Sequence, residues 1–111
     1  MDNKTEAYIQ SECVKYLWNE RPETRGQLFE VNNNPLNAID GARRKAMGMV
    51  AGVSDLVLLR KDLPPLCIEV KDGKGRQTPA QIEWQKVAES VGCKYVVIRS
   101  LDEFKAAIDN A

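Results

Sequence analysis

Residues 52–71 read GVSDLVLLRKDLPPLCIEVK, two apolar runs of strand length separated by a polar, proline-containing segment. The runs over 53–60 and 66–71 predict two strands, and residues 61–65 predict the turn that joins them. Pairing the strands about residue 63 sets Asp55 opposite residues 70 and 71. Because side chains alternate along a strand, Glu69 and Lys71 share one face, and we expect Asp55 to lie beside them.

Two carboxylates and an ammonium group are thus expected at one end of an apolar hairpin. Carboxylates among aliphatic residues are costly to remove from water unless a cation compensates their charge. Lys71 compensates one charge, whereas a bound Mg²⁺ or Mn²⁺ would compensate both and leave positions for water and phosphate. The alternative that these residues leave open is a solvated Glu-x-Lys pair on an exposed strand.

The flanking residues predict further helices and strands on either side of the hairpin. Thr5 is a plausible helix N-cap, Pro22 a helix terminator, and Gly92 the end of a helix that Thr78-Pro79 begins. The predicted elements are a helix over 5–19 with Trp18 in its apolar stripe and in the core, a strand over 27–31, a short helix over 36–42, a helix over 78–91, a strand over 94–99 and a helix over 100–108 capped by Ser100. The glycine- and methionine-rich segment over 47–52 indicates a loop that lies close against a neighbour, or backbone turns with positive φ. We therefore predict an α/β fold, one mixed central sheet flanked by helices in the order α-β-β-β-α-β-α.

Composition excludes several classes of protein. The 111 residues suffice for one domain, predicted to span 1–111, and no apolar run approaches the roughly 18 residues of a membrane-spanning helix. The chain has no histidine, which excludes imidazole-based catalysis and histidine-ligated zinc. Its three cysteines, each among apolar neighbours, are typical of reduced thiols in a cytoplasm.

The net charge is zero, with 16 basic and 16 acidic side chains, which argues against a strongly electropositive nucleic-acid binder. The distribution is uneven, because residues 41–76 carry eight basic and four acidic side chains. Two groups of cations lie in this basic third, the triplet Arg43, Arg44 and Lys45, and the pair Lys74 and Arg76 in a glycine-rich loop. Both groups are candidates for phosphate contacts, and the alternative for the triplet is a solubilising surface turn.

Residues 52–71, together with TPAQIEWQ at 78–85, resemble the virus-type replication-repair nuclease (VRR-NUC) domain of the PD-(D/E)XK nuclease superfamily. The resemblance covers nearly the whole chain, including Glu6 and Gln10 of the first helix and the last strand-helix pair. One departure is Ser54, which stands where the superfamily has a proline. That proline shapes the start of the strand and is not a metal ligand, so we do not expect the departure to abolish activity.

The resemblance implies a role for each residue of the hairpin. Asp55, Glu69 and the carbonyl of Val70 would be ligands of Mg²⁺, with Mn²⁺ able to substitute. Lys71 would orient or deprotonate the attacking water and stabilise charge in the phosphorane-like transition state.

The resemblance also implies roles for two helical residues. Gln81 would support the site from the helix that follows. Glu6 would reach the metal directly or through water, and its alternative is a solvated acid in the first turn of a helix. Trp84 is expected to pack behind Gln81.

The function implied is that of a metal-dependent DNA endonuclease acting on branched DNA such as four-way junctions, in the cytoplasm of a bacterium or a phage-infected cell. A homodimer is expected, with its contact at residues 46–53 or along the first helix. Two alternatives remain open: a catalytically silent nucleic-acid-binding or assembly module of the same fold, and an RNA nuclease. The intact set of Asp55, Glu69 and Lys71 favours an enzyme, because a binding module has no physical reason to retain it.

Overall fold

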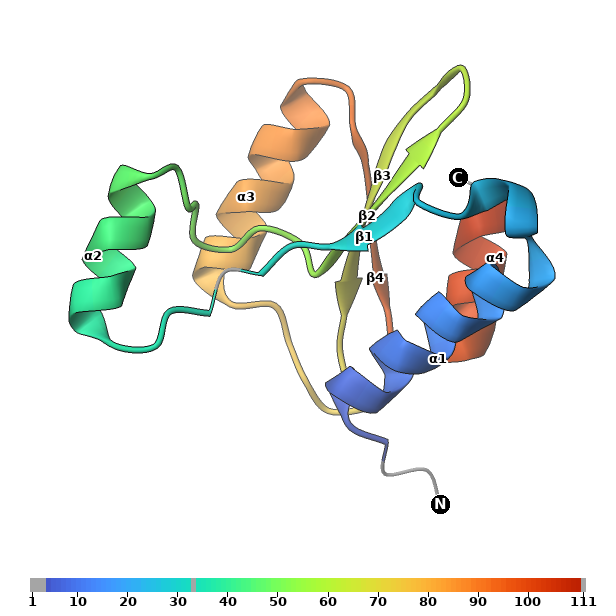
Figure 1. Ribbon diagram of the computed structural model, residues 1–111, viewed down its shortest axis with the longest axis horizontal. Coiled ribbons are helices and arrows are strands. Elements are labelled where there is room, and N and C mark those ends of the chain that lie inside the picture. Colours follow the sequence, from blue (N-terminus) through green and yellow to red (C-terminus); the bar gives the residue numbers. More distant parts are fainter. Residues whose placement is uncertain (1–3, 33, 111) are drawn as a thin grey trace.

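The structure is a computed structural model that describes residues 4–32 and 34–110 (Figure 1). Its sheet has four strands in the order β1-β2-β3-β4, antiparallel except for the parallel pair β3 and β4. The strands are β1 (Leu28–Glu30), β2 (Leu56–Arg60), β3 (Leu63–Val70) and β4 (Lys94–Ile98). The helices are α1 (Glu6–Glu20), α2 (Ala38–Ala46), α3 (Pro79–Ser90) and α4 (Leu101–Asn110), with a 3-10 turn, η1 (Pro22–Thr24).

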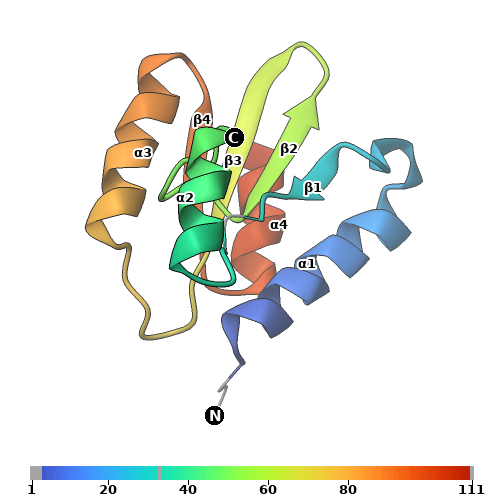
Figure 2. The same ribbon diagram turned by 60° about the vertical axis from the view of Figure 1, so that its left-hand side comes forward.

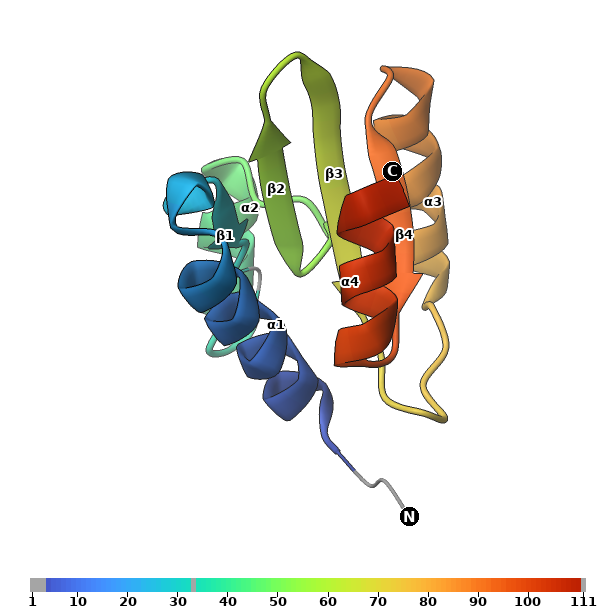
Figure 3. The ribbon, with the colours of Figure 1, turned by 90° about the vertical axis from the view of Figure 1, so that its right-hand side faces the viewer.

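The helices form a layer on each face of the sheet. Helices α1 and α4 cover one face, as Figure 3 shows, and α3, which crosses over from β3 to β4, covers the other. The main core lies between α1, α4 and the sheet, and it contains Ile9, Cys13, Leu17, Leu56, Leu58, Leu66, Ile68, Val70, Ile98 and Phe104. This arrangement confirms the predicted α/β class and mixed sheet.

Side-chain caps fix where the helices begin. The hydroxyl of Thr5 accepts a hydrogen bond from Tyr8 N, and the hydroxyl of Ser100 accepts one from Glu103 N. Thr78 accepts from Gln81 N at the start of α3. Each cap satisfies a backbone donor that has no partner within the helix, and all three were predicted from the sequence.

The turn between β2 and β3 is shorter than predicted. Residues 61–65 were expected to form it, but β3 already begins at Leu63, which pairs with Arg60, and Asp62 takes a left-handed conformation with φ of 60°. Two consecutive prolines fit this strand because β4 pairs only with residues 66–70. The hairpin thus projects past β4 (Figure 1), and the carbonyl of Pro64 accepts hydrogen bonds from the Arg60 guanidinium.

The short turn and a bulge also change the register. Leu56 pairs with Ile68, and the register shifts between Leu58 and Arg60. Continued by one residue, this register places Asp55 opposite Glu69, not opposite residues 70 and 71 as predicted. The prediction assumed a turn centred on residue 63. A turn centred on residue 63 pairs Asp55 with residue 71, two positions from Glu69, so the predicted face of each side chain is unchanged.

Helix α2 is longer than the predicted 36–42 and contains the basic triplet 43–45. Asn37 caps it by accepting from Asp40 N, and Asp40 pairs with Arg44 over 2.8 Å and with Arg43 over 3.6 Å. These i,i+3 and i,i+4 pairs extend the helix through residues that were expected to lie outside it. The helix lies on the same side of the sheet as α3 (Figure 2), and all nine of its residues are described, none of them buried.

Trp18 was predicted to lie in the core, and this prediction is wrong. Its side chain is 53% exposed on α1, and the guanidinium of Arg25 lies 4.8 Å from its ring centroid. The core positions of the helix are taken by Ile9, Cys13 and Leu17. Among residues 4–32 and 34–110, no helix combines the length and the apolar character that crossing a bilayer requires.

Candidate active site

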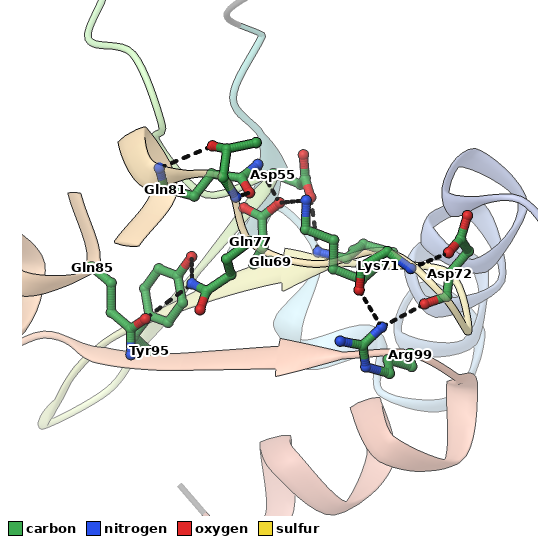
Figure 4. A network of polar contacts seen from close by, with 12 residues as sticks. Asp55, Glu69, Lys71, Asp72, Gln77, Gln81, Gln85, Tyr95 and Arg99 are labelled. Atoms are coloured by element: carbon green, nitrogen blue, oxygen red, sulfur yellow. Dashed lines mark hydrogen bonds and ion pairs between the residues drawn. The ribbon is translucent and has the colours of Figure 1, made fainter. Parts of the chain in front are cut away.

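Asp55 is held in place at the start of β2 by hydrogen bonds on two sides. Its carbonyl accepts from Val31 N over 2.9 Å, which ties it to the chain beyond β1. Its carboxylate Oδ2 accepts from Val70 N over 2.8 Å, which ties it to the end of β3 (Figure 4). The hairpin therefore fixes the carboxylate of Asp55 beside the last residues of β3, as the alternating pattern predicted.

Glu69 lies opposite Asp55 and is 1% exposed. Its Oε2 accepts a hydrogen bond from Gln81 Nε2 over 3.0 Å and lies 3.6 Å from Lys71 Nζ. Its Oε1 is buried and has no hydrogen-bond partner among the described residues. A buried carboxylate oxygen without a partner is rare in native proteins, so this oxygen is left to accept from a water or to contact a cation.

The surroundings of Glu69, with Asp55 beside it, oppose ionisation of the Glu69 carboxyl group. Burial, and after it the nearby carboxylate of Asp55, raise the pKa of Glu69 from 4.5 to about 8, while Lys71 acts in the opposite direction. One ammonium therefore does not compensate two carboxylates, as the sequence indicated. A second positive charge at the site would allow both to ionise.

Gln81 reaches Glu69 because it also closes the start of α3. Its Oε1 accepts from Thr78 N over 2.8 Å, while its own backbone N donates to the Thr78 hydroxyl. This capping box leaves the Gln81 amide nitrogen free to point at Glu69. The Thr-x-x-Gln sequence is thus both a helix start and the reason why the amide donates to the carboxylate.

A cavity of about 320 Å³, which we call the acidic cavity, joins these residues. Four of the residues predicted from the sequence line it, namely Glu6, Asp55, Glu69 and Gln81. Gln10, quoted for the family resemblance, lines it too, as do Val31, Gly52, Val53 and Thr78. Glu30 and Asn34 also line it, and neither was singled out, because the pattern around each shows only a short strand and a turn.

The residues around this cavity fit a hard divalent cation. Among the described residues, no three His, Cys, Asp or Glu side chains gather into a cluster that could hold a metal by themselves. Mg²⁺ does not need such a cluster, since it is usually held by one or two carboxylates and keeps several waters. Asp55, the unpartnered Oε1 of Glu69 and the polar cavity match that requirement.

Gly52 brings the loop before β2 against the start of α3. Its φ is 86°, and a Cβ there would collide with the carbonyl of Ala80 and lie 2.8 Å from Gln81 N. The glycine-rich segment was predicted to adopt positive φ or to approach a neighbour closely, and Gly52 does both. This contact fixes the distance between the strand that carries Asp55 and the helix that carries Gln81.

A second polar network lies under α3. Gln77 Nε2 donates to Gln85 Oε1 over 3.0 Å and to the Tyr95 hydroxyl over 3.2 Å, and Figure 4 shows it beside Glu69. Burial raises the pKa of Tyr95 to about 12. Trp84 packs on Tyr95, with ring centroids 6.1 Å apart. No sequence motif indicated this network, because its members lie on three different elements.

The predicted phosphate-contacting residues fall into two separate places. The triplet of α2 does not line the acidic cavity, and Arg43 and Arg44 both face Asp40. The pKa of Asp40 is lowered by a hydrogen bond from Leu36 N and by Arg44. Lys74 and Arg76 lie on the loop that leads from Lys71 to α3, and they line a different cavity from the acidic residues.

Comparison with known proteins finds a likeness to a solved structure. No family model matches the sequence, and a search of curated proteins finds no match. Among solved structures, a chain described as a "VRR_NUC domain protein" superposes with a TM-score of 0.75 and 26% sequence identity. The alignment covers 97% of this chain and 88% of the other. It supports the predicted family resemblance and indicates a nuclease of the PD-(D/E)XK type.

Proposed function

Because this chain is a VRR-NUC-like domain, we propose that residues 1–111 form one metal-dependent endonuclease domain that hydrolyses phosphodiester bonds in DNA. The observation that carries the proposal is the buried, unpartnered Oε1 of Glu69, a residue that lines a polar cavity together with Asp55. Placing the buried carboxylate of Glu69 beside the half-buried carboxylate of Asp55 is unfavourable unless a cation compensates their charge.

In this proposal Asp55, Glu69 and the carbonyl of Val70 hold the metal, and Glu6 contacts it directly or through water from the cavity wall. Mg²⁺ is the proposed ion, and Mn²⁺ is expected to substitute for it. When bound, such an ion polarises the phosphate and lowers the pKa of a bound water. Gln81 keeps Glu69 in place through its amide, which engages Oε2 and leaves Oε1 without a hydrogen-bond partner among the described residues.

Lys71 supplies the remaining charge. Its ammonium is nearly buried and lies 3.6 Å from Glu69 Oε2. As an ammonium it would orient the attacking water by hydrogen bonding and stabilise the extra negative charge on the phosphorus oxygens in the transition state. A fixed ammonium needs little reorganisation for this task, because Glu69 already restrains it. Deprotonation of that water by Lys71 would instead require the neutral amine, which takes up the proton and becomes the ammonium.

The proposed substrate is branched DNA, such as a four-way junction, and the proposed assembly is a homodimer. Leu36 and Ile39, at and near the start of α2, are each 84% exposed, and Met47 is 76% exposed. Exposed apolar side chains in one region are typical of a protein-protein contact. Two copies would present two sites to a branched substrate. The three cysteines are free thiols, which suits the proposed cytoplasmic location.

Two alternative functions each differ from the proposed DNA endonuclease in one feature. A silent nucleic-acid-binding module of this fold would bind DNA with no need for Lys71 buried against Glu69. An RNA nuclease would use the same carboxylates, and only its substrate would differ. The burial of Lys71 and Glu69 together favours the enzyme over the silent module.

The test is a Mg²⁺-dependent cleavage assay on duplex, nicked, flap and four-way DNA, with matched RNA substrates. Asp55→Asn and Glu69→Gln should each lower the cleavage rate at least about a hundredfold, the scale of losing one preorganised electrostatic contact. Asp62→Asn, in the turn of the hairpin, removes an exposed carboxylate and serves as the control. Wild-type cleavage by either site variant would refute the role of that residue. Cleavage of RNA alone would refute the DNA substrate.

A further inference from the structure

The loop between β3 and α3 is held rigid by two charged side chains. The carboxylate Oδ1 of Asp72 accepts from Lys74 N over 2.9 Å and from Gly75 N over 2.6 Å. From the end of β4, Arg99 Nη1 donates to the carbonyls of Asp72 and Gly75 over 2.6 and 2.7 Å (Figure 4). A loop with charge-assisted bonds at both its donors and its acceptors keeps one shape.

This loop borders a second cavity of about 620 Å³. Three of its lining residues are cations, Lys74, Arg76 and Arg99, and the described residues that line it include no carboxylate. The other lining residues are Gly73, Gly75, Gln77 and Val97. A Cβ built on Gly73 has no described atom within 4 Å, so a ligand can approach the backbone there. We call this cavity the basic groove.

The basic groove and the acidic cavity are lined by neighbouring residues of the same segment. Gln77 lines the basic groove, and its neighbour Thr78 lines the acidic cavity. Gly75 lines the groove, and a Cβ built on it would lie 3.1 Å from Oε2 of Glu6, which lines the acidic cavity. The loop that lines the basic groove therefore also approaches a carboxylate of the acidic cavity, so a place suited to an anion adjoins a place suited to a cation.

The guanidinium of Arg99 has N–H groups that its hydrogen bonds to the loop do not use. Its Nη1 makes both bonds to the loop, and its Nε and Nη2 have no hydrogen-bond partner among the described residues. A guanidinium carries five N–H groups in a fixed plane and matches phosphate geometry well. By contrast, the other candidate cations Arg43 and Arg44 already face the carboxylate of Asp40.

We propose that the basic groove binds a phosphodiester group of the substrate strand next to the bond that is cut. Arg99 is its central residue, holding the loop through Nη1 and contacting the phosphate through Nε and Nη2. Lys74 and Arg76 add charge from the loop. The inference rests on the proposed nuclease function and names the surface that places the strand. Because this contact is made to substrate and transition state alike, it acts on KM and on binding more than on kcat.

The experiment measures binding of fluorescently labelled nicked duplex DNA by anisotropy in EDTA, at several salt concentrations. Arg99→Gln should raise Kd by about tenfold and lower the slope of log K against log salt by about 1. Lys74→Gln should lower the slope similarly. Arg99→Lys should restore the slope and only part of the affinity, because one ammonium cannot replace the guanidinium plane. Lys61→Gln, in the β2–β3 turn, is the charge-matched control.

A double variant and a kinetic assay separate this role from simple support of the fold. If Arg99 also positions Lys74, Arg99→Gln with Lys74→Gln should cost less affinity than the two single losses added together. In Mg²⁺, Arg99→Gln should raise KM with kcat within about threefold of wild type. A kcat loss with unchanged Kd, or an unchanged salt slope, would overturn the groove while leaving the nuclease intact. A wild-type protein that neither binds nor cuts DNA would overturn the proposed function itself.

Discussion

Gln81 and Glu69 are joined by a hydrogen bond of 3.0 Å that makes the start of α3 part of the site. The amide oxygen of Gln81 closes the helix cap on Thr78, so its amide nitrogen is left for the carboxylate. With Oε2 of Glu69 occupied by Gln81 and Lys71, Oε1 is the oxygen left for a ligand. A local helix-start motif thereby contributes to which oxygen of Glu69, 12 positions earlier, keeps no hydrogen-bond partner among the described residues.

Gln81→Glu separates the two tasks of this side chain. A glutamate at this position can still close the capping box, so thermal stability should stay close to wild type. It would also place a third carboxylate beside Glu69 and Asp55, so the cleavage rate should fall at least tenfold. Gln81→Ala loses both tasks and should cost about 1 kcal/mol of unfolding free energy as well. Full activity of Gln81→Glu would contradict the role of the amide donor.

The pH dependence of stability follows from Glu69. Its pKa of about 8 in the folded state, raised by burial and then by Asp55, lies above the ordinary value of 4.5. Between these two values the folded protein holds a proton that the unfolded chain has released. In EDTA, stability should therefore fall as pH rises from about 4.5 to about 8.

Glu69→Gln removes this titration and provides the control. Urea unfolding from pH 5 to 9 should show the variant gaining at least about 1 kcal/mol on wild type across the range. In wild type, Mg²⁺ should raise the melting temperature more at pH 8.5 than at pH 6, since a ligated carboxylate must release its proton. Parallel curves for wild type and variant would rule out Glu69 as the titrating group.

Gly52→Ala should damage both stability and activity. A methyl group at this position collides with the backbone of Ala80, and φ is positive, so we expect a loss of more than about 2 kcal/mol. Gly26→Ala is a matched control, because φ there is 90° and a Cβ has no described atom within 4 Å. The excess loss at Gly52, measured by urea unfolding, reports the contact with α3. Equal losses would show that only the backbone conformation matters.

Replacing Arg43, Arg44 and Lys45 with alanine tests the helix α2 as a DNA contact. Phosphate contacts carry no base information, so binding should weaken for all sequences alike and its salt dependence should flatten. Asp40 already faces two of these cations, which limits the expected change in slope to about 1. An unchanged slope in the anisotropy assay would reassign the triplet to a solvated helix face.

Features that depend on local sequence could be predicted, whereas features that depend on contacts elsewhere in the fold could not. The strands, the Thr78 cap and the shared face of Glu69 and Lys71 follow from period and propensity, and the structure has them. The register of Asp55 depended on a bulge near Leu58 that no local pattern marks. Trp18 fitted an apolar stripe on α1, but three smaller neighbours fill the core instead.

The residues that sequence reasoning missed act across long separations. Arg99 reaches back to Asp72 and Gly75 only because β4 lies parallel to β3, so that both strands end at the same edge. Glu30 lines the acidic cavity because β1 pairs with β2, and nothing near Glu30 in the sequence indicates this. Such residues become visible once the order of strands in the sheet is known.

The predicted homodimer is tested by mass and by a charged substitution. The contact was expected at residues 46–53 or along the first helix, and Met47, Met49, Val50 and Val53 line a largely apolar cavity of about 280 Å³. Together with exposed Leu36 and Ile39, they offer apolar surface toward the roughly 1,000 Å² that a specific contact requires. Light scattering at micromolar concentration should give twice the 12.5 kDa of one chain.

Met47→Glu should convert the dimer to a monomer, because pairing would bury the new carboxylate without a partner. Val91→Glu is the control, since Val91 is 74% exposed at the end of α3, outside the predicted contact. Tyr8→Glu, on the exposed face of α1, tests the first helix as the contact. A wild-type mass near 12.5 kDa would refute the dimer. A dimer that survives Met47→Glu but not Tyr8→Glu would place the contact on α1 and not at residues 46–53.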